Sequence, residues 1–558
     1  MPTIEISHKD LCELIGKELS IEELSEAIHY AKSGIDAIND DTLTVKVEDT
    51  NRPDLWSTEG IAREIKSRYV KGGCPKYTVK QSDVVVNVDE KNKNVRPYTV
   101  CAVVKNLKIT PAILFQIIQL QEKIHTTFGR NRKELAMGIY DLERIKPPIR
   151  FTTVNPNGIK FAPLDFEEKL TPKEILEKHP KGKEYGHLLA GFKEYPMFID
   201  SRNEVLSIPP IINSNYSGKI AEDTKNAFIE CSGFNFKFLI PALNVVVAAL
   251  ADRKANIESV KVVYPDKVMV TPDIAPKKSQ VDIDYVNKVS GLNLSGNEIC
   301  KLLEHANYDA KLVGKKIELL YPAYRQDIMH QRDVVEDVII SYGYDKVEPV
   351  LPKLKIVGSI DKVEIFSNKV AEIMVDLGFQ EILSYTLTNK ENLFRKMNMG
   401  EEKIVEIENP VSLNWNVFKN WLLPSLMELF SSNQHVSYPQ KIFEIGDVAL
   451  IDNKMETRTR NVRKLVVAIA DSHIAYNDIA AVLDALLKKF NIKYKLEKSK
   501  HQTFIDGRVA DIVIKNKPVG FIGEIHPLVL KNWKLEMPTV AFEIELNCLD
   551  RSFNQRKI

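Results

Sequence analysis

Residues 325–347 read RQDIMHQRDVVEDVIISYGYDKV and place four carboxylates within eleven positions: Asp327, Asp333, Glu336 and Asp337. From Asp333 onward, valine and isoleucine recur at the three- and four-residue spacing of an amphipathic helix. Positions i, i+3 and i+4 share one helix face, so Asp333, Glu336 and Asp337 are expected side by side. Asp327 precedes the helix and could fold back onto that face from a loop.

This acidic cluster has two interpretations. Like charges repel, so their clustering costs stability unless a cation lies among them. Oxygen ligands without His or Cys suit a hard ion such as magnesium, which keeps several waters. The alternative is an acidic first turn that is favoured by the helix dipole. The spacing alone leaves both interpretations open.

Length and composition indicate a multidomain globular chain. With 558 residues the chain is too long for one hydrophobic core, and three or four domains are expected. Apolar residues make up 44% and charged residues 27%, which is an ordinary globular balance. Lys and Arg number 77 against 76 Asp and Glu, so the net charge of +1 indicates no global attraction to nucleic acid. Any RNA contact is therefore expected to be local.

Targeting and redox signals favour a cytoplasmic location. The opening stretch, MPTIEISHKDLCELIG, has no basic region followed by an apolar one. The longest apolar stretch, residues 243–251, is about half of what a bilayer span needs. The six cysteines contain no CxxC pair, which argues against a zinc site or a disulfide framework. The sequence thus predicts a cytoplasmic protein with no membrane partner.

Four segments are predicted along the chain: residues 1–91, 92–265, 267–349 and 350–558. Each mixes strands and helices, so the fold class is multidomain α/β, of the α+β kind. The second segment is expected to be a module of short strands and helices. The third is expected to be a small α/β domain, and the last an antiparallel sheet with helices set to one side.

The first segment carries clear helix signals. Ser20 and Glu23 have the spacing of a capping box at the start of a helix. Residues 42–50 alternate like a half-buried strand. A turn at residues 52–54 is followed by a helix with Ser57 as its N-cap, in which Glu59 and Arg63 form an i, i+4 pair. Residues 91–94 are predicted to be a polar linker.

In the second segment, residues 100–107 predict a buried strand, and a helix is expected to begin with Pro111 as its first residue. The third segment is predicted to hold a strand at 267–272, one helix over 285–308 and a strand at 316–322. For the last segment, the predicted strands are 441–450, 464–470, 509–514 and 539–546, and the predicted helices are 366–377 and 477–490.

Several phrases resemble one family in the family's own order. They are NRPDLWSTEGIARE, HTTFGRNRKELAMGIYDLERIKPPI, PPIINS with ECSG, YRQDIMHQRDVVEDVIISYGYDKV, ENPVSLN with LLPSL and FEIGDV, and GFIGEIHP. Together they resemble the β-subunit family of the phenylalanine–tRNA ligases, in the shorter archaeal and eukaryotic form. The resemblance runs from residue 51 nearly to the C-terminus.

The resemblance implies a magnesium site in the third segment, which corresponds to the family's B5 domain. The family's carboxylates are spaced 6, 3 and 1 residues apart, and Asp327, Asp333, Glu336 and Asp337 reproduce that spacing. Such an ion is expected to brace the domain and not to take part in chemistry, because no nucleophile or base lies beside it in the sequence.

For the second segment the resemblance implies an editing module that hydrolyses tyrosine misattached to the tRNA for phenylalanine. An apolar pocket rejects an added hydroxyl poorly, so a second site that recognises the phenol can remove the wrong product. The candidate pocket residues are Ser207, Asn213, Ser214 and Glu230. In the alternative interpretation, Asn213 and Ser214 cap a turn and Glu230 is a surface charge at the end of a strand.

A basic run within GRNRKELAMG offers a candidate tRNA contact through Arg130, Arg132 and Lys133. The alternative is a solvated loop. Residues 51–64 contain polar side chains but no catalytic pattern. Arg52 and Asp54 are therefore interpreted as setting a turn, and Ile61 and Ile65 as packing the helix that follows.

The last segment resembles the family's catalytic-like domain, built on the class II synthetase antiparallel sheet. Neither GxGxGxER nor GxxxxGK[ST] occurs in residues 350–558, so no ATP site is expected there. Where the family phrase before LLPSL usually carries an arginine, this chain has Lys419. The segment is therefore interpreted as scaffold.

The predicted assembly, as the resemblance implies it, is an α2β2 tetramer. The α subunit would bind ATP and phenylalanine, and this chain would bind the tRNA for phenylalanine and proofread the product. Two alternatives are a non-enzymatic assembly scaffold whose editing has decayed, and a freestanding magnesium-dependent hydrolase acting at the acidic cluster.

Overall fold

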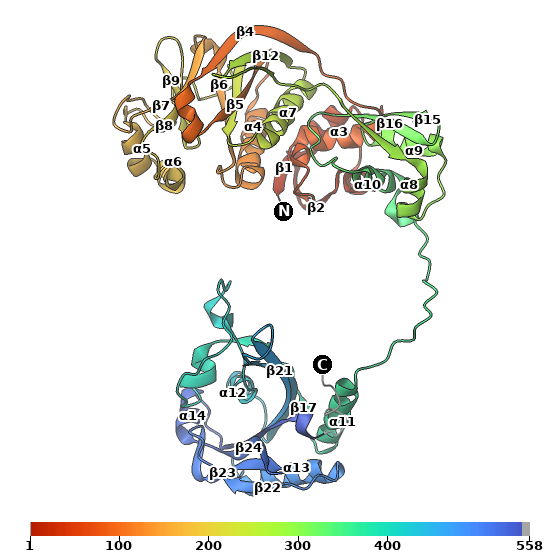
Figure 1. Cartoon of the computed structure of the whole chain (residues 1–558), viewed down its shortest axis with the longest axis vertical. Coiled ribbons are helices and arrows are strands. Elements are labelled where there is room, and N and C mark those ends of the chain that lie inside the picture. Colours follow the sequence, from red (N-terminus) through yellow and green to blue (C-terminus); the bar gives the residue numbers. More distant parts are fainter. Residues whose placement is uncertain (1, 550–558) are drawn as a thin grey trace. The chain divides into compact units, whose positions relative to one another are not determined.

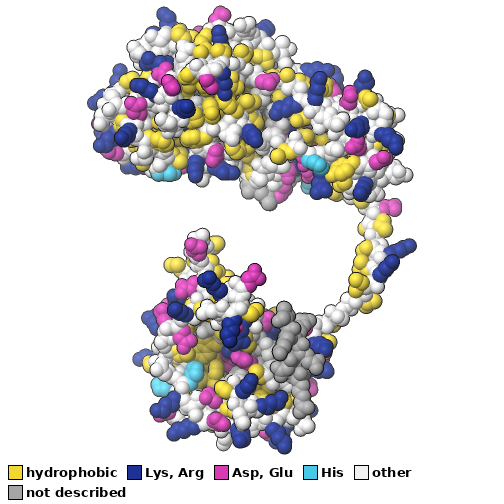
Figure 2. Space-filling view, viewed as in Figure 1, with side chains coloured by type: hydrophobic (Ala, Val, Ile, Leu, Met, Phe, Trp, Pro, Cys, Tyr) yellow, Lys and Arg dark blue, Asp and Glu magenta, His cyan; other side chains and the backbone are white. Residues whose placement is uncertain are grey.

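A computed structural model describes residues 2–549, which belong to two compact units, Met1–Val350 and Leu351–Ile558 (Figure 1). The predicted mixture of helices and strands over several domains is confirmed. Between η7 (Tyr344–Lys346) and α11 (Lys362–Asp376) the chain forms no helix or strand, and its apolar side chains lie on the surface (Figure 2).

The first unit begins with a three-stranded antiparallel sheet in the order β1-β3-β2. Ser20 accepts a hydrogen bond from the backbone N–H of Glu23, whose carboxylate accepts one from the N–H of Ser20, so the predicted capping box is confirmed. Ser57 caps the third helix as predicted. The elements are β1 (Thr3–Ser7), α1 (His8–Ile15), α2 (Ile21–Ala27), β2 (Ser33–Asn39), β3 (Thr42–Val47) and α3 (Thr58–Tyr69).

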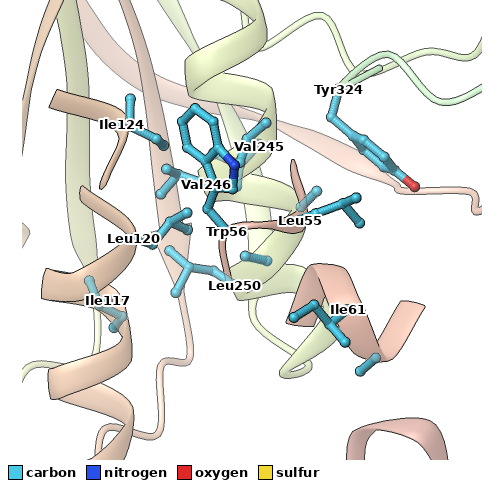
Figure 3. Close-up of a cluster of buried hydrophobic side chains, with 14 of the residues drawn as sticks. Leu55, Trp56, Ile61, Ile117, Leu120, Ile124, Val245, Val246, Leu250 and Tyr324 are labelled. Atoms are coloured by element: carbon cyan, nitrogen blue, oxygen red, sulfur yellow. The ribbon is translucent and has the colours of Figure 1, made fainter. Parts of the chain in front are cut away.

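Trp56 joins this small sheet to the rest of the unit. Its side chain is fully buried and points into a cluster that α4 (Pro111–Lys123) and α7 (Phe236–Asp252) supply (Figure 3). The labelled partners are Leu55, Ile61, Ile117, Leu120, Ile124, Val245, Val246, Leu250 and Tyr324. The first two segments therefore share one hydrophobic core.

The predicted pair of Glu59 with Arg63 is wrong. Glu59 accepts hydrogen bonds from Arg253, and Arg63 donates to Asp252. Both partners lie at the end of α7, which packs beside α3 and offers each side chain a partner with the opposite charge. These tertiary contacts replace the local i, i+4 pair, which stabilises a helix by only about 0.2–0.5 kcal/mol.

A ten-stranded mixed sheet follows, in the order β10-β9-β8-β7-β4-β12-β5-β11-β6, with β13 beside β12. Its strands are β4 (Val79–Val88), β5 (Tyr98–Lys105), β6 (Leu135–Asp141), β7 (Ile149–Val154), β8 (Tyr195–Ile199), β9 (Val205–Ile208), β10 (Ile212–Asn213), β11 (Ala227–Gly233), β12 (Asn256–Val263) and β13 (Val268–Thr271).

This sheet extends past both expected ends of the second segment. β4 pairs in parallel with β12 and β7, although it precedes the expected boundary at residue 91. β13, expected in the third segment, pairs with β12. Pairing between strands far apart in the sequence leaves no local signal. The predicted linker at 91–94 is the end of a short 3-10 helix (Glu90–Asn94) in which Asn92 is buried.

The third segment folds as a three-stranded sheet, β14-β16-β15, with helices α8, α9 and α10. The single helix predicted over 285–308 is wrong, because Gly291 ends α8 in the left-handed region at φ 74° and Ser295 opens α9 with a capping box. The elements are β14 (Lys277–Asp282), α8 (Ile283–Ser290), α9 (Gly296–His305), β15 (Asp309–Val313), β16 (Lys316–Tyr321) and α10 (Gln331–Tyr342).

The second unit contains a seven-stranded sheet that is antiparallel, as expected, except for its β17–β20 pair. The expectation that its helices lie on one side is wrong, because helices pack against both faces. Successive residues of β21 alternate between two clusters, one shared with α12 and one shared with α11 and α13. The elements are β17 (Gln380–Glu381), α12 (Leu423–Ser432), β20 (Gln440–Ile451), β21 (Thr459–Ala470), α13 (Tyr476–Lys489), β22 (Lys495–Lys498), β23 (Phe504–Ile514), β24 (Lys517–Ile525), α14 (Pro527–Asn532) and β25 (Thr539–Glu545).

Within residues 2–549, no helix combines the length and the apolar character that crossing a membrane requires.

Candidate functional site

A cavity of about 410 Å³ lies within the first unit. Its walls come from α4, β6, β9, β11 and the chain that follows β9, and they bring together Ser207, Asn213 and Glu230. These three residues, from positions 207 to 230, were all predicted to belong to one pocket. Pockets of this size are typical of small-molecule sites.

The cavity forms where the two ends of the large sheet approach each other. β6 is the last strand at one end, and β9 and β10 lie at the other. The hydroxyl oxygen of Tyr140, on β6, lies 2.7 Å from the hydroxyl oxygen of Ser207, on β9. Arg132 donates hydrogen bonds to the carbonyls of Pro210 and Ile211 and so ties the segment before β6 to the turn after β9.

Glu230 supplies the carboxylate of the site. Its side chain extends from β11, the strand next to β6, and is buried, with 1% of the residue exposed. Oε1 accepts a hydrogen bond from the Tyr140 hydroxyl at 3.2 Å, whereas Oε2 is buried without a partner among residues 2–549. Burial raises the pKa of Glu230 to about 8, although the nearby charge of Arg96 opposes that rise.

The opposite wall carries an ion pair and a histidine. Arg132 donates to Glu122 at 2.8 Å. Burial disfavours the charged form of Glu122, but the contact with His125 and the charge of Arg132 outweigh it and lower the pKa of Glu122 to about 2. Nε2 of His125 accepts the backbone N–H of Met137 at 2.9 Å, so this nitrogen is not available as a base.

The remaining four residues predicted for the pocket or for tRNA contact are Ser214, Arg130, Arg132 and Lys133, and only Arg132 lines the cavity. Ser214 does not line the cavity, and its hydroxyl bonds Ser217 within a turn, which agrees with the alternative interpretation. Arg132 is buried in the cavity wall, whereas Arg130 and Lys133 are exposed. The predicted basic run is therefore divided between the cavity and the surface.

Sequence reasoning missed two buried residues of the site, Tyr140 and Arg96. Arg96 donates to the hydroxyl and the carbonyl of Ser232, two residues from Glu230. From sequence alone, a tyrosine in an alternating strand is assigned to the hydrophobic core, and an arginine after a polar stretch is assigned to the surface. The missed signal was the phrase GIYD, in which Gly138 leaves room for the Tyr140 hydroxyl.

The four carboxylates of the acidic cluster point to different partners. Arg325 donates to both oxygens of Asp327 and also to Asp337, which accepts a further bond from Tyr308. Asp333 accepts the backbone N–H groups of Met329 and His330, and Glu336 pairs with Lys32.

Protein cations, the Tyr308 hydroxyl and backbone N–H groups therefore engage both oxygens of Asp327 and one oxygen of each of the other three carboxylates. Across residues 2–549, no group of three or more His, Cys, Asp or Glu side chains is placed to hold a metal ion. In this arrangement the donor set does not fit the predicted ion, and Asp333 acts as part of a helix cap. The helix itself, α10, is confirmed.

In the second unit, Lys419, in the phrase before LLPSL, is buried. Lys419 donates to Glu444 at 2.7 Å and to the hydroxyl of Ser384, which in turn donates to Glu444. Both charged side chains are at most 3% exposed. The charge at this position therefore serves an internal contact.

Comparisons with known proteins define the class first. Residues 82–239 match the B3/4 domain, residues 279–344 match the tRNA synthetase B5 domain, and residues 347–546 match the phenylalanyl tRNA synthetase beta chain CLM domain. The order of these domains, together with the fold, is that of a subunit of an aminoacyl-tRNA synthetase.

Full-length relatives then identify the family. The phenylalanine–tRNA ligase beta subunit of Pyrococcus abyssi is 49% identical over 554 residues, covering 98% of this chain and 100% of that protein. The one from Methanocaldococcus jannaschii is 37% identical over 551 residues, covering 98% and 100%. A solved N-terminal fragment of the phenylalanyl-tRNA synthetase beta subunit from Pyrococcus horikoshii is 49% identical, with a TM-score of 0.60, and covers 62% of this chain and 100% of that fragment. The chain belongs to the family of phenylalanine–tRNA ligase beta subunits.

Proposed function

We propose that this chain, as the beta subunit of a phenylalanine–tRNA ligase, hydrolyses tyrosine that has been attached in error to the tRNA for phenylalanine. The observation that supports this function is the free Oε2 of Glu230, a buried acceptor in a cavity of about 410 Å³. A tyrosine side chain carries the donor that this oxygen lacks, and a phenylalanine side chain does not.

Selection in this cavity works through the cost of an unpaired polar group. A tyrosine phenol entering the cavity donates its hydrogen to Glu230. Phenylalanine in the same position would leave Oε2 without a partner, which sites built to bind a hydroxyl reject by large factors, about 10⁴–10⁵ in well-studied cases. The correct product is thereby left intact while the wrong one is held for hydrolysis.

The chemical step is the hydrolysis of an ester. Water adds to the carbonyl carbon, the bond to the ribose oxygen breaks, and that oxygen takes a proton, which leaves tyrosine and free tRNA. Neither histidine of the cavity is free to act as base, because Nε2 of His125 accepts from Met137 and Nδ1 of His179 accepts from Lys181. We therefore assign to the cavity the selection and orientation of the ester.

Aminoacylation itself is assigned to a partner. Residues 350–558 carry neither GxGxGxER nor GxxxxGK[ST], so we propose that an α subunit binds ATP and phenylalanine in an α2β2 tetramer. The antiparallel sheet of the second unit serves in that assembly as a class II synthetase-like scaffold. Exposed Arg130 and Lys133 are the candidate contacts to tRNA.

Magnesium has no role in the proposed reaction. Asp327, Asp333 and Asp337 are engaged by Arg325 and by backbone N–H groups, so no step is routed through an ion at α10. The alternative of a freestanding magnesium-dependent hydrolase loses its proposed site for the same reason.

Deacylation of purified Tyr-tRNA by the complex reconstituted with an α-type subunit tests the proposal. A charge-assisted hydrogen bond is worth about 1.5–3 kcal/mol, so Glu230→Ala should slow deacylation by about ten- to a hundredfold. The deacylation rate of Glu230→Gln should fall between those of wild type and Glu230→Ala. Phenylalanine charging by the complex should barely change in either variant. Glu258→Ala, on β12 of the same sheet, is the matched control. Deacylation at the wild-type rate by Glu230→Ala would refute the assignment.

A further inference from the structure

Tyr140 and Glu230 lie on neighbouring strands of the large sheet. In the β6–β11 pairing, Glu230 is opposite Gly138, and Tyr140 lies two residues further along β6 on the same face. The Tyr140 side chain folds back over Gly138, so that its hydroxyl oxygen reaches both Glu230, at 3.2 Å, and Ser207, at 2.7 Å. All three side chains are buried.

Gly138 is what allows this fold-back. A Cβ atom at position 138 would lie 2.1 Å from the hydroxyl oxygen of Tyr140 and 2.4 Å from the ring carbon that carries it. Neither distance is possible for a real side chain. The glycine thus makes room for one specific position of the Tyr140 hydroxyl, directly between Ser207 and Glu230.

The directions of these hydrogen bonds follow from the number of hydrogens. A phenol has one, so Tyr140 can donate to only one of its two partners. When Glu230 is ionised its carboxylate has no hydrogen to give, so it accepts the hydrogen of Tyr140, and the Ser207 hydroxyl then donates to the phenolic oxygen. The result is a directed chain from Ser207 through Tyr140 to Oε1 of Glu230.

This chain occupies one carboxylate oxygen and leaves the other free. We infer that Tyr140 is a positioning residue for tyrosine recognition: its hydroxyl holds Oε1 of Glu230 so that Oε2 faces an incoming phenol. The inference rests on the proposed function. Tyr140 does not line the cavity itself, so it acts through Glu230 and Ser207 and not by touching the substrate.

The surroundings of Glu230 give this role a measurable consequence. The charged and titratable groups near its carboxylate are the Arg96 guanidinium, the thiols of Cys101 and Cys231, and the Tyr140 phenol. Burial raises the pKa of Glu230, and the charge of Arg96 and the hydroxyls of Tyr140 and Ser232 counteract that rise. Without the Tyr140 hydrogen bond the carboxylate should ionise only at a higher pH.

The pH profile of Tyr-tRNA deacylation by the reconstituted complex tests the inference. Rates are taken relative to Glu230→Gln, which removes the base-catalysed background. In Tyr140→Phe, kcat/KM for Tyr-tRNA should fall about tenfold at pH 7.5, and the pH of half-maximal relative rate should move upward. Discrimination between Tyr-tRNA and Phe-tRNA should fall with it.

Tyr264→Phe is the matched control. Tyr264 is buried in the same hydrophobic cluster as Tyr140, and its hydroxyl bonds only the backbone of Thr99, away from the cavity. Both variants lose a buried phenolic hydrogen bond, so a merely structural role for Tyr140 would make them behave alike. Thermal melts of both variants show whether the fold is retained.

Two further variants keep the inference testable if Tyr140→Phe fails to fold. Ser207→Ala removes the donor to the phenolic oxygen and should shift the profile in the same direction by a smaller amount. Gly138→Ala displaces the Tyr140 hydroxyl without removing it and should reproduce Tyr140→Phe.

The possible failures are distinct. If wild type deacylates Tyr-tRNA, Glu230→Ala is slow and Tyr140→Phe matches Tyr264→Phe in rate and pH profile, the role of Tyr140 is refuted and the proposed function stands. If the wild-type complex leaves Tyr-tRNA intact, the proposed function falls, and the role of Tyr140 with it.

Discussion

Glu230 combines recognition with a cost to stability, because a buried carboxyl prefers its neutral form. Its pKa is about 8 in the folded protein against an ordinary value of 4.5. Between these values the folded protein holds a proton that the unfolded chain has released. The free energy of unfolding therefore falls as pH rises from about 4.5 to about 8.

Glu230→Gln should remove this pH dependence. Each pKa unit corresponds to about 1.4 kcal/mol. The free energy of unfolding of the variant, relative to that of wild type, is therefore expected to rise by about 2 kcal/mol or more between pH 5 and pH 9. Thermal melts of the first unit's transition across this range would show it. Glu122→Gln is the control, because the pKa of Glu122 is lowered to about 2 and its contribution is constant in this window. A constant offset between Glu230→Gln and wild type would contradict the prediction.

The buried pair of Lys419 and Glu444 offers a second test at this scale. Both side chains are almost fully buried and lie 2.7 Å apart. Removal of one partner leaves a buried unpaired charge, so Lys419→Met should destabilise the second unit by about 3–5 kcal/mol. Lys419→Met combined with Glu444→Leu should recover most of that loss. Additive losses in this double-mutant cycle would show that the two side chains do not interact.

At the residue level, the sequence predictions rested on short phrases that carried a signal. Ser207, Asn213 and Glu230 each stand in or beside such a phrase, and the structure brings them to one cavity. Tyr140 and Arg96 carried no such signal, because their roles depend on contacts between strands that are distant in the sequence. Arg132 was assigned to the surface, since a basic run does not reveal which of its members turns inward.

At the scale of elements, local sequence signals were sufficient to predict where helices begin. They were not sufficient to predict which strands or side chains pair with one another. The capping box at Ser20, the N-cap at Ser57 and the first-turn Pro111 all begin helices as predicted. The break between α8 and α9 was missed, although Gly291 and Ser295 are ordinary stop and start signals.

The helix α10 shows how one sequence pattern can have a different structural outcome. Its carboxylates have the spacing of a metal site, but the structure gives Asp333 to the helix cap, Glu336 to Lys32, and Asp337 to Arg325 and Tyr308. The side chain of Lys32 also contacts Asp49, so the same cluster links the first small sheet to the third segment.

A magnesium titration distinguishes the two outcomes for α10. Because protein donors already hold these oxygens, millimolar magnesium is expected to leave the Tm of wild type unchanged. A ligand that binds only the folded state would raise Tm with concentration. The control is Asp333→Ala combined with Glu336→Ala, which removes two of the four carboxylates. A rise in wild type that is absent from this variant would restore the magnesium site that the sequence predicts.

At the scale of the whole molecule, the two units differ in what they contribute. The first holds the cavity and the second holds the antiparallel sheet, and each has its own hydrophobic clusters. The chemistry proposed for the cavity draws on residues of the first unit alone. The proposed editing and the proposed assembly role are therefore expected to be separable.

The segment between the units is the natural place to separate them. Residues 348–360 form no helix or strand, and Val350, Leu351 and Val357 are each at least 88% exposed. An exposed, irregular backbone is the preferred target of proteases. Limited proteolysis of the chain alone is thus expected to cut within this segment and to leave two stable fragments.

The N-terminal fragment should fold by itself and retain the selective cavity. The solved fragment from Pyrococcus horikoshii, which covers 62% of this chain, supports a boundary near residue 350. Residues 1–350 should melt cooperatively and should hydrolyse Tyr-tRNA more than Phe-tRNA, with a raised KM because contacts from the rest of the assembly are missing. Glu230→Ala in the same fragment is the matched control. A folded fragment that shows no preference for Tyr-tRNA would mean that selection needs the second unit or a partner, and not the cavity alone.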